Sequence, residues 1–485
     1  MTPARGLLIS CSCVLLTLNS GGQTTAPDWF NQAAAKQARR DFEGAIADYT
    51  KAIELDPRLV PAYVNRGAAR RGRGDAGGAL ADYEQAIKLA PNYAPAYVNR
   101  ANLRLGQGES GEALADLDRA LALDSKDAKV FNLRAEVRVS KGDMDGAIAD
   151  YSRALELDPS LTQAFFNRMT VREMQGDWDG IIAEHDRAIA KNPGIAASYT
   201  QRAKAKMSKG DWDGAIADYT KALEAAKGNA VSSPGRLLDR AEAKASKGDS
   251  VGALADYNDA LTRAPSSYIA YTGRGQAKLL HGDREGALAD FARAVALNAK
   301  HSEAHQGTGL THGIAGKWAD AVAAFRRAVE VDARRRVRPH LLLWYAQSRQ
   351  GDRSGADEGL AQFITNRLAT PAGANPRFTG YGALRASTEA SRPGGALDWD
   401  ARVLDFLSGK TSEADFLAAG AVHSKRHGPA PCEAAFYAGV KRLLAGDKSG
   451  SMQHFRKAAA SNFKATPERS LAEAELQRLD KNLTP

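Results

Sequence analysis

The sequence predicts an all-α solenoid, a chain of helix pairs stacked one upon the next. Two alanine-rich columns support this prediction, the first with a spacing of 34 residues broken by one step of 38, and the second seven residues behind it. A fixed period of about 20–50 residues is typical of repeat architectures, and 34 is the period of helix–turn–helix repeats. The first column is Ala45, Ala79, Ala113, Ala147, Ile181, Ala215, Ala253, Ala287 and Ala321, and the second is Ala52, Ala86, Ala120, Ala154, Ala188, Ala222, Ala260, Ala294 and Ala328.

Length and composition fit a solenoid. The chain has 485 residues, of which 44% are hydrophobic and 25% are charged, as in soluble globular proteins. One compact core rarely serves a chain of this length, but a solenoid escapes that limit because each unit packs only against its neighbours. The net charge is +9, yet acidic and basic residues alternate along the expected helices. Mixed signs favour a solvated surface, so we expect no nucleic-acid partner.

The N-terminus predicts export to the periplasm or the outer membrane. Residues 1–5 are weakly positive, residues 6–18 are mostly apolar, and the small residues at 20–22 offer a cleavage site. We therefore expect residues 1–22 to be an export signal whose apolar run is too short to span a membrane. Lipidation at Cys11, a signal anchor and a cytoplasmic protein with a mistaken start are alternatives. Membrane association is expected only through this segment.

Each unit holds small and bulky residues at fixed places. We number the places from the start of a unit, so that the two alanine columns lie at places 20 and 27. Place 8 is small in most units, which lets two helices approach closely, and bulky side chains at places 4 and 24 fill the space between them. Place 24 holds Tyr49, Tyr83, Leu117, Tyr151, His185, Tyr219, Tyr257, Phe291 and Phe325, and place 4 holds Trp29, Tyr63, Tyr97, Phe131, Phe165, Tyr199, Leu237 and Tyr271.

Glycine marks the turn inside each unit. At place 15 the first helix needs a left-handed residue to end, and the acidic residue that usually follows favours the start of the next helix. These glycines are Gly74, Gly108, Gly142, Gly176, Gly210, Gly248, Gly282 and Gly316. The second helix ends at proline in several units, namely at Pro57, Pro91, Pro159, Pro193 and Pro265. The 38-residue step falls at residues 227–234, which have loop composition, so we expect the stack to continue across it.

The columns fade beyond residue 333. Residues 334–396 begin with a basic joint, continue as a degenerate helical pair and end in a Pro/Gly-rich loop. Residues 397–485 predict a short helix pair, one further unit with Gly439 at place 8 and Phe455 at place 24, and a final amphipathic helix. A terminal repeat needs such a capping helix because its outer face has no neighbour.

The shared places over residues 28–333 resemble the tetratricopeptide repeat (TPR) family, with nine units in all. This resemblance implies a right-handed TPR superhelix, here with a C-terminal helical extension and a capping helix. The segments LLLWYAQ, DWDARVLDFLSGK, CEAAFYAG and RKAAASNF also resemble the end of bacterial TPR adaptor lipoproteins of the new-lipoprotein-I type. That second resemblance implies a scaffold in the cell envelope that docks peptidoglycan hydrolases or proteases.

A ladder of asparagines is the candidate binding site. In a TPR stack the first helices of successive units line the concave face, and place 6 points into it. Asparagine donates and accepts hydrogen bonds, so a column of asparagines can hold the backbone of an extended peptide with little sequence preference. The alternative is that asparagine merely suits a solvated helix face. The candidate peptide-binding residues are Asn31, Asn65, Asn99 and Asn167 at place 6, Asn132 one place earlier in its unit, and the neighbouring Asn102, Arg71, Glu136 and Lys204.

Two charged columns accompany the ladder. Both are lost in the ninth unit, where Thr308 and Ala324 stand instead. This joint loss predicts that the columns pair with each other, within or between units, and tie the helices together. A basic strip for acidic ligands is the alternative. Place 7 carries Arg66, Arg100, Arg134, Arg168, Arg202, Arg240 and Arg274, and place 23 carries Asp48, Asp82, Asp116, Asp150, Glu184, Asp218, Asp256 and Asp290.

No pattern predicts catalytic residues, a metal site or a cofactor. Nucleophile elbows, Walker loops and zinc-protease motifs are absent from the sequence. His301, His305 and His312 share a helical face, but two of them fall on packing places, so core packing is the simpler interpretation. Cys432 is interpreted as a small residue packed at a helix start. We expect an exported scaffold or adaptor that binds proteins or peptides; a cytoplasmic chaperone-like adaptor, or an enzyme hidden in residues 334–485, is the alternative.

Overall fold

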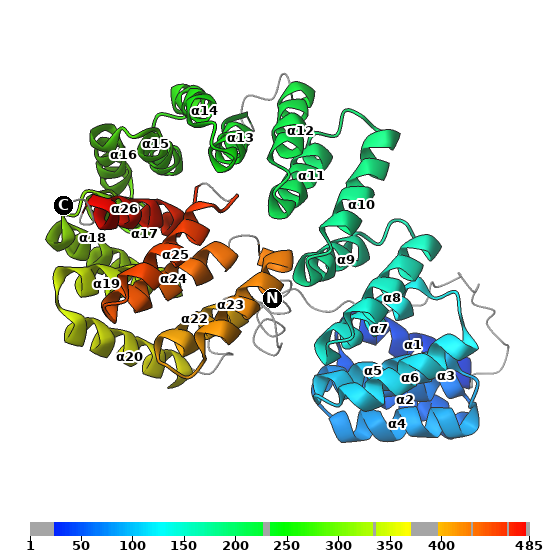
Figure 1. The fold of residues 1–485 in the computed structure, drawn as a ribbon. Helices are drawn as coiled ribbons and strands as arrows, with labels where there is room; N and C mark the ends of the chain where they lie inside the picture. Colours follow the sequence, from blue (N-terminus) through cyan, green and yellow to red (C-terminus); the bar gives the residue numbers. More distant parts are fainter. Residues whose placement is uncertain are drawn as a thin grey trace. The chain divides into compact units, whose positions relative to one another are not determined.

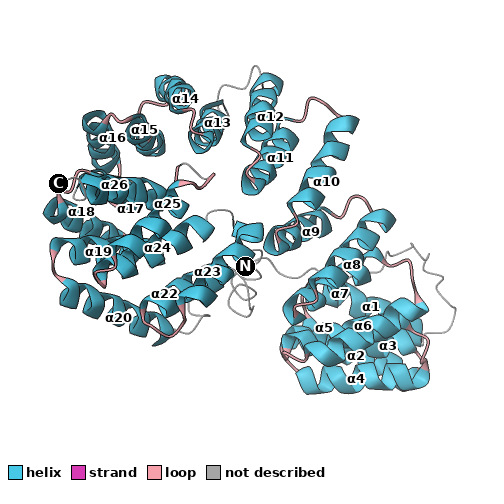
Figure 2. Ribbon diagram, viewed as in Figure 1, coloured by secondary structure: helices cyan, strands magenta, loops and turns pink. Residues whose placement is uncertain are grey.

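The described architecture is entirely helical. The computed structural model describes residues 24–226, 233–332, 336–369, 396–427, 430–462 and 465–481. These residues form 25 helices and no strand (Figure 1, Figure 2), which confirms the predicted all-α solenoid. Within these ranges none of the helices combines the length and apolarity needed to cross a membrane. The export signal expected at residues 1–22, the loop at 227–232 and nearly all of the Pro/Gly-rich loop lie outside the described residues.

Nine helix pairs come first in the part of the chain that the structure describes. Their first helices are α1 (Ala26–Ala38), α3 (Val60–Arg73), α5 (Ala94–Gly106), α7 (Ala128–Lys141), α9 (Thr162–Gln175), α11 (Ala196–Lys209), α13 (Ser233–Lys247), α15 (Tyr268–His281) and α17 (Ser302–Ile314). Their second helices are α2 (Phe42–Leu55), α4 (Ala76–Leu89), α6 (Ser110–Leu123), α8 (Met144–Leu157), α10 (Trp178–Lys191), α12 (Trp212–Ala225), α14 (Ser250–Arg263), α16 (Arg284–Leu297) and α18 (Trp318–Val331). The chain forms two compact units, an N-terminal unit described over residues 24–171 and a C-terminal unit that begins at residue 172, so the division in the sequence falls within α9.

The turn between the two helices of a pair contains the left-handed glycine that the sequence predicts. Gly142 ends α7 with a φ of 85°, a left-handed conformation that glycine adopts without steric cost. The next residue, Asp143, accepts a hydrogen bond of 3.0 Å from the backbone N–H of Gly146 and so caps the start of α8. In the first pair Arg40 takes the glycine place with a φ of 65°, which costs about 1–2 kcal/mol for a residue with a side chain.

Small residues bring the two helices of a pair into close contact. Ala147 and the other alanines of place 20 are fully buried. A Cβ atom on Gly67 of α3 would lie only 2.6 Å from Cε1 of Tyr83, the buried place-24 ring of the same pair. A Cβ atom on Gly309 would lie 2.7 Å from the ring of Phe325 in the ninth pair. The predicted packing of small places against bulky places is therefore confirmed.

His185 occupies the place-24 position of the fifth pair and makes stability depend on pH. The side chain is 8% exposed, and its burial lowers the pKa of His185 below the usual value of 6.5. The charge of Arg202 lowers this pKa further, whereas Glu184 and Asp186 oppose the decrease. The unfolded chain therefore binds a proton more readily than the folded chain as the pH falls below about 6.5. We expect the C-terminal unit to lose stability between pH 7.5 and pH 5.5, and His185→Tyr, which restores the residue of most other pairs, to reduce that loss. Urea unfolding at the two pH values measures it, and an unchanged pH dependence in the variant would contradict the assignment.

A hydrophobic core joins the ninth pair to the rest of the C-terminal unit. Among the described residues seven helices follow α18, namely α19 (Val337–Gln350), α20 (Arg353–Ala369), α22 (Ala396–Leu407), α23 (Glu413–His427), α24 (Ala430–Leu444), α25 (Lys448–Ala459) and α26 (Pro467–Lys481). Tyr345 of α19 is fully buried, with Trp318 of α18 and Phe436 of α24 edge-on at centroid distances of 5.6 and 5.3 Å. Helices α24 and α25 repeat the geometry of a pair, because a Cβ atom on Gly439 would lie 2.7 Å from the ring of Phe455.

Candidate peptide-binding face

The first helices of successive pairs form a common face. In the N-terminal unit α3 contacts both α1 and α5, and in the C-terminal unit α15 contacts both α13 and α17. In Figure 1 the helices α13, α15 and α17 follow the inner side of the C-terminal unit, and α14, α16 and α18 follow its outer side. We call the surface formed by the first helices the inner face. All nine candidate binding residues lie on first helices.

Asn99 and Asn102 of α5 are oriented by their own helix. Nδ2 of Asn99 donates to the backbone carbonyl of Pro95 at 2.9 Å, and Nδ2 of Asn102 donates to that of Val98 at 3.0 Å. Short polar side chains commonly bond a carbonyl four residues earlier in this way. Within the described residues the Oδ1 atoms of both amides accept no hydrogen bond. This part of the inner face therefore presents hydrogen-bond acceptors.

The ladder begins with Asn31 of α1 and Asn65 of α3. Asn31 is exposed, whereas Asn65 is half-buried and hydrogen bonds the phenol of Tyr49. The Tyr49 hydroxyl donates to Oε1 of Gln37 at 3.0 Å. Burial raises the pKa of Tyr49, and the bond from Asn65 opposes that rise. Asn65 thus connects the inner face to the buried ring of the neighbouring pair.

Asn132, Glu136 and Asn167 form a cluster between α7 and α9. Nδ2 of Asn132 donates to Oε1 of Glu136 at 3.0 Å, and Nδ2 of Asn167 donates to the same atom at 3.3 Å. Asn167 is only 4% exposed, and its Oδ1 atom accepts a bond of 2.7 Å from Gln163. Burial raises the pKa of Glu136, although the two amides stabilise its ionised form. The asparagines of the ladder therefore differ in exposure, because Asn167 is buried and hydrogen bonds within this cluster rather than lying on an open surface.

The two basic candidates have different surroundings. Arg71 of α3 lies near the buried hydroxyl of Tyr83, which has no hydrogen-bond partner among the described residues. Burial raises the pKa of Tyr83 to about 12, and the charge of Arg71 opposes that rise. Lys204 of α11 is exposed in the C-terminal unit and lies near Asp239, where it opposes the rise that burial causes in the pKa of that carboxyl.

The arginine and aspartate columns pair within most units. Arg134 of α7 forms two hydrogen bonds with Asp150 of α8, from Nε at 2.8 Å and from Nη2 at 2.6 Å, and Asp150 is 3% exposed. The guanidinium group also lies over the ring of Phe131, 5.4 Å from its centroid, a favourable cation–π arrangement. The same two-fold pairing joins Arg66 to Asp82, Arg100 to Asp116, Arg202 to Asp218, Arg240 to Asp256 and Arg274 to Asp290.

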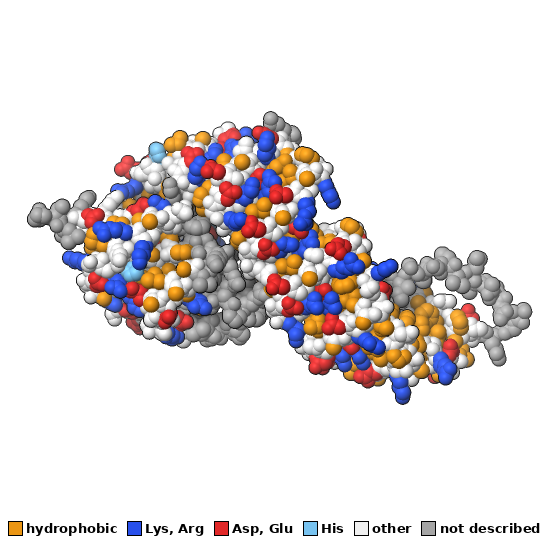
Figure 3. Space-filling model, turned by 45° about the vertical axis from the view of Figure 1, so that its right-hand side comes forward, with side chains coloured by type: hydrophobic (Ala, Val, Ile, Leu, Met, Phe, Trp, Pro, Cys, Tyr) orange, Lys and Arg blue, Asp and Glu red, His pale blue; other side chains and the backbone are white. Residues whose placement is uncertain are grey.

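A second column of basic residues, at place 11, pairs with the same aspartates. Arg138, one helical turn after Arg134, places Nη1 2.9 Å from Oδ2 of Asp150, the oxygen that also accepts the bond from Nε of Arg134. Sequence reasoning missed this column, although place 11 is basic in most units. Its ion pairs are Lys36–Asp48, Arg70–Asp82, Arg104–Asp116, Lys206–Asp218, Lys244–Asp256 and Lys278–Asp290. In the face drawn in Figure 3 basic and acidic side chains are interspersed, without a strip of one sign. The charged columns are therefore structural.

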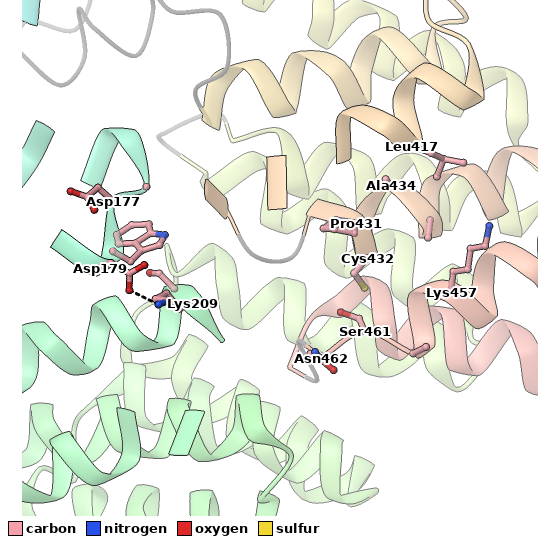
Figure 4. A pocket seen from close by; sticks show the side chains of 15 residues that line it. Asp177, Asp179, Lys209, Leu417, Pro431, Cys432, Ala434, Lys457, Ser461 and Asn462 are labelled. Carbon is pink, nitrogen blue, oxygen red and sulfur yellow. Dashed lines mark hydrogen bonds and ion pairs between the residues drawn. The ribbon is translucent and has the colours of Figure 1, made fainter. Parts of the chain in front are cut away.

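A cavity of about 810 Å³ lies in the C-terminal unit (Figure 4). One side carries Asp177 and the ion pair between Lys209 Nζ and Asp179 Oδ1, which are 2.5 Å apart. The other side carries Cys432, which is 2% exposed near the start of α24 as expected, with its Sγ atom bonded to the Ala458 carbonyl at 3.5 Å. Burial raises the pKa of Cys432 to about 11. A thiol that stays protonated at neutral pH is a poor nucleophile, so Cys432 is a packing residue.

The histidines of the ninth pair have separate partners. The ring of His301 packs edge-on against Tyr268 with centroids 4.8 Å apart. Nε2 of His305 lies 3.2 Å from the carbonyl oxygen of Ala299. Across the part of the chain that the structure describes, no three His, Cys, Asp or Glu side chains gather as metal ligands would. His301 therefore packs against a neighbouring ring, and His305 bonds the backbone.

Comparison with known proteins identifies the repeats. Family models described as tetratricopeptide repeat match residues 29–59, 60–93, 98–161, 200–268, 238–302 and 272–339. No curated protein matches the chain.

Solved TPR structures also resemble the chain. MamA is 23% identical, with 41% of this chain and 96% of MamA covered and a TM-score of 0.25. A tetratricopeptide repeat protein from Parabacteroides merdae is 17% identical, with coverages of 59% and 98% and a TM-score of 0.27. Yeast Tom70 is 15% identical, with coverages of 94% and 96% and a TM-score of 0.36. Because the family models match more than half of the 485 residues, this chain belongs to the tetratricopeptide repeat family.

Proposed function

We propose that this protein is a non-enzymatic adaptor that binds extended peptide segments of partner proteins on its inner face. TPR proteins are in general protein-interaction scaffolds. The observation that carries the proposal is the acceptor surface of α5, where Asn99 and Asn102 keep their Oδ1 atoms for a ligand. The backbone N–H groups of an extended peptide are matching donors, and each must find an acceptor when it is bound.

The charged side chains support a scaffold over an enzyme. Most of the buried aspartates of this column, such as Asp150, are neutralised by two cations and hold the helices of a pair together. The thiol of Cys432 stays protonated and packed. The aspartates, their cations and the Cys432 thiol therefore stabilise the fold. The amides of the inner face are the groups that can bind a partner.

We also propose that the adaptor works in the bacterial cell envelope, where hydrolases or proteases are its partners. The composition of residues 1–22 and the resemblance of the C-terminal segments to envelope adaptor lipoproteins support this location. Cell fractionation and N-terminal sequencing of the mature protein test it. A protein recovered in the cytoplasm with residues 1–22 intact would favour the alternative, a cytoplasmic assembly or chaperone-like adaptor.

Replacing Asn65, Asn99 and Asn167 together by alanine is expected to abolish partner capture. Hydrogen-bonding side chains at the centre of an interface often carry most of its affinity, so we expect the captured partners to fall by about tenfold or more. Affinity capture from envelope extracts, followed by mass spectrometry, measures the effect. Circular dichroism must show unchanged helicity, because Asn167 is buried. Asn92→Ala, an exposed asparagine in the loop before α5, is the matched control, and an unchanged capture profile for the triple variant would refute the proposal.

A further inference from the structure

Glu136 is half-buried and differs from the buried carboxylates of the N-terminal unit. Each buried aspartate of a second helix faces basic side chains; Asp150, for example, receives both Arg134 and Arg138. Oε1 of Glu136 instead receives only the amides of Asn132 and Asn167. Within the described residues no cation pairs with Glu136, and its Oε2 atom accepts no hydrogen bond.

An ionised carboxylate in this position costs free energy unless a ligand supplies the opposite charge. Burial in a poorly solvated site disfavours the ionised form, and burial does raise the pKa of Glu136. Two amide donors offset only part of this cost, because a buried charge is stabilised best by an opposite charge with hydrogen bonds. The fold itself does not need the charge, since a glutamine at this position could accept the same two bonds. The negative charge is therefore available for recognition.

A large hydrophobic residue is next to this cluster in the sequence. Phe166 precedes Asn167 on α9 and is 51% exposed. A cation that approaches the open oxygen of Glu136 gains an ion pair with a hydrogen bond. The acceptor atoms of Asn99 and Asn102 lie on α5, two helices earlier on the same inner face. The charge of Glu136 and the acceptor atoms of α5 both favour a ligand that carries donors and a positive charge.

We propose that the inner face of α7 and α9 recognises a lysine or arginine side chain of the bound peptide, with Glu136 as the residue that selects it. This inference rests on the proposed function, because the same peptide must be held by the asparagine ladder. The adaptor then prefers extended segments of partner proteins that contain a basic residue. It binds segments that contain only neutral or acidic residues more weakly.

A positional-scanning library of capped synthetic peptides, retained on the immobilised full-length protein, tests the inference. The wild-type protein is expected to enrich lysine or arginine at one position by about tenfold over norleucine, which has a similar shape and no charge. Glu136→Gln keeps the two amide bonds and removes the charge, so it should abolish this enrichment. Glu54→Gln, an exposed glutamate on the second helix α2, is the matched control and should retain it.

The outcomes separate this inference from the proposed function. A library from which the wild-type protein retains nothing contradicts both. Peptides that are retained without basic enrichment, or with enrichment that survives Glu136→Gln, contradict only the selection by Glu136. The melting temperature of Glu136→Gln should equal or exceed that of the wild type, because a destabilising charge is removed. A lower melting temperature would show that the carboxylate serves the fold, which would also overturn the inference.

Discussion

Asp150→Ala is expected to lower the free energy of unfolding of the N-terminal unit by about 3–5 kcal/mol. The carboxylate is 3% exposed and receives three bonds of 2.6–2.9 Å from Arg134 and Arg138. Its removal leaves two guanidinium groups facing each other across a buried gap, without the charge that neutralises them. Both arginine side chains keep contact with water, at 16% and 23% exposure, so we expect a loss near the lower limit.

Asp118→Ala is the control, because Asp118 also pairs with Arg134. Nη1 of Arg134 donates to Asp118 at 2.8 Å, but the aspartate is 53% exposed. An exposed pair of this kind contributes only about 0–1 kcal/mol. Urea unfolding followed by circular dichroism should therefore show a large shift for one aspartate and a small shift for the other. Equal shifts would show that burial does not decide the strength of these pairs.

The repeated part of the chain could be predicted well from the sequence. Contacts in a solenoid join neighbouring units, so a place that is small or bulky in every copy reveals its packing partner. The pairing of Arg134 with Asp150 followed from the joint loss of both columns in the ninth unit. The second cation, Arg138, lies one turn after Arg134 on the same side of α7 and was equally visible as a column.

The candidate site could be predicted only as a face. Place 6 indicates which side of the helix an asparagine occupies, but not which hydrogen bonds its amide makes. Asn99 bonds a carbonyl of its own helix, whereas Asn167 bonds Glu136 on another helix. Glu136 was expected only as a neighbour of the ladder. Its lack of a counterion depends on the side chains of two helix pairs, which no single repeat place records.

The C-terminal contacts could not be predicted, because they join residues that no repeat relates. Tyr345 of α19 donates a hydrogen bond of 2.6 Å to Glu475 of α26, which is 130 residues later in the sequence. A hydrophobic pattern shows that both helices have a buried side, but it does not say which side meets which. From the sequence, Glu475 is expected to lie on the exposed polar side of an amphipathic helix. The structure shows instead that it is fully buried.

Glu475→Ala is therefore the second substitution with a large expected effect, about 3–5 kcal/mol on the C-terminal unit. Oε1 of Glu475 also accepts bonds of 3.0 Å from Arg349 and 2.8 Å from Arg478. Arg478 in turn donates to the carbonyl oxygen of Gly313 at 2.6 Å, near the end of α17. Without the carboxylate both arginines lose their buried counterion, and α26 loses the network that holds it against the ninth pair.

Hydrogen exchange measured by mass spectrometry can locate this effect. In Glu475→Ala the amides of α26 should exchange faster than those of α25, because local opening follows the loss of the contacts that hold a segment. Glu473→Ala is the matched control, since Glu473 lies on the same helix, is 48% exposed and pairs with Arg469 one turn earlier. Such an exposed pair contributes about 0.2–0.5 kcal/mol, so exchange should barely change. If both variants left α26 equally protected, the capping helix would be held by its apolar side alone, and the buried charges would add nothing to its docking.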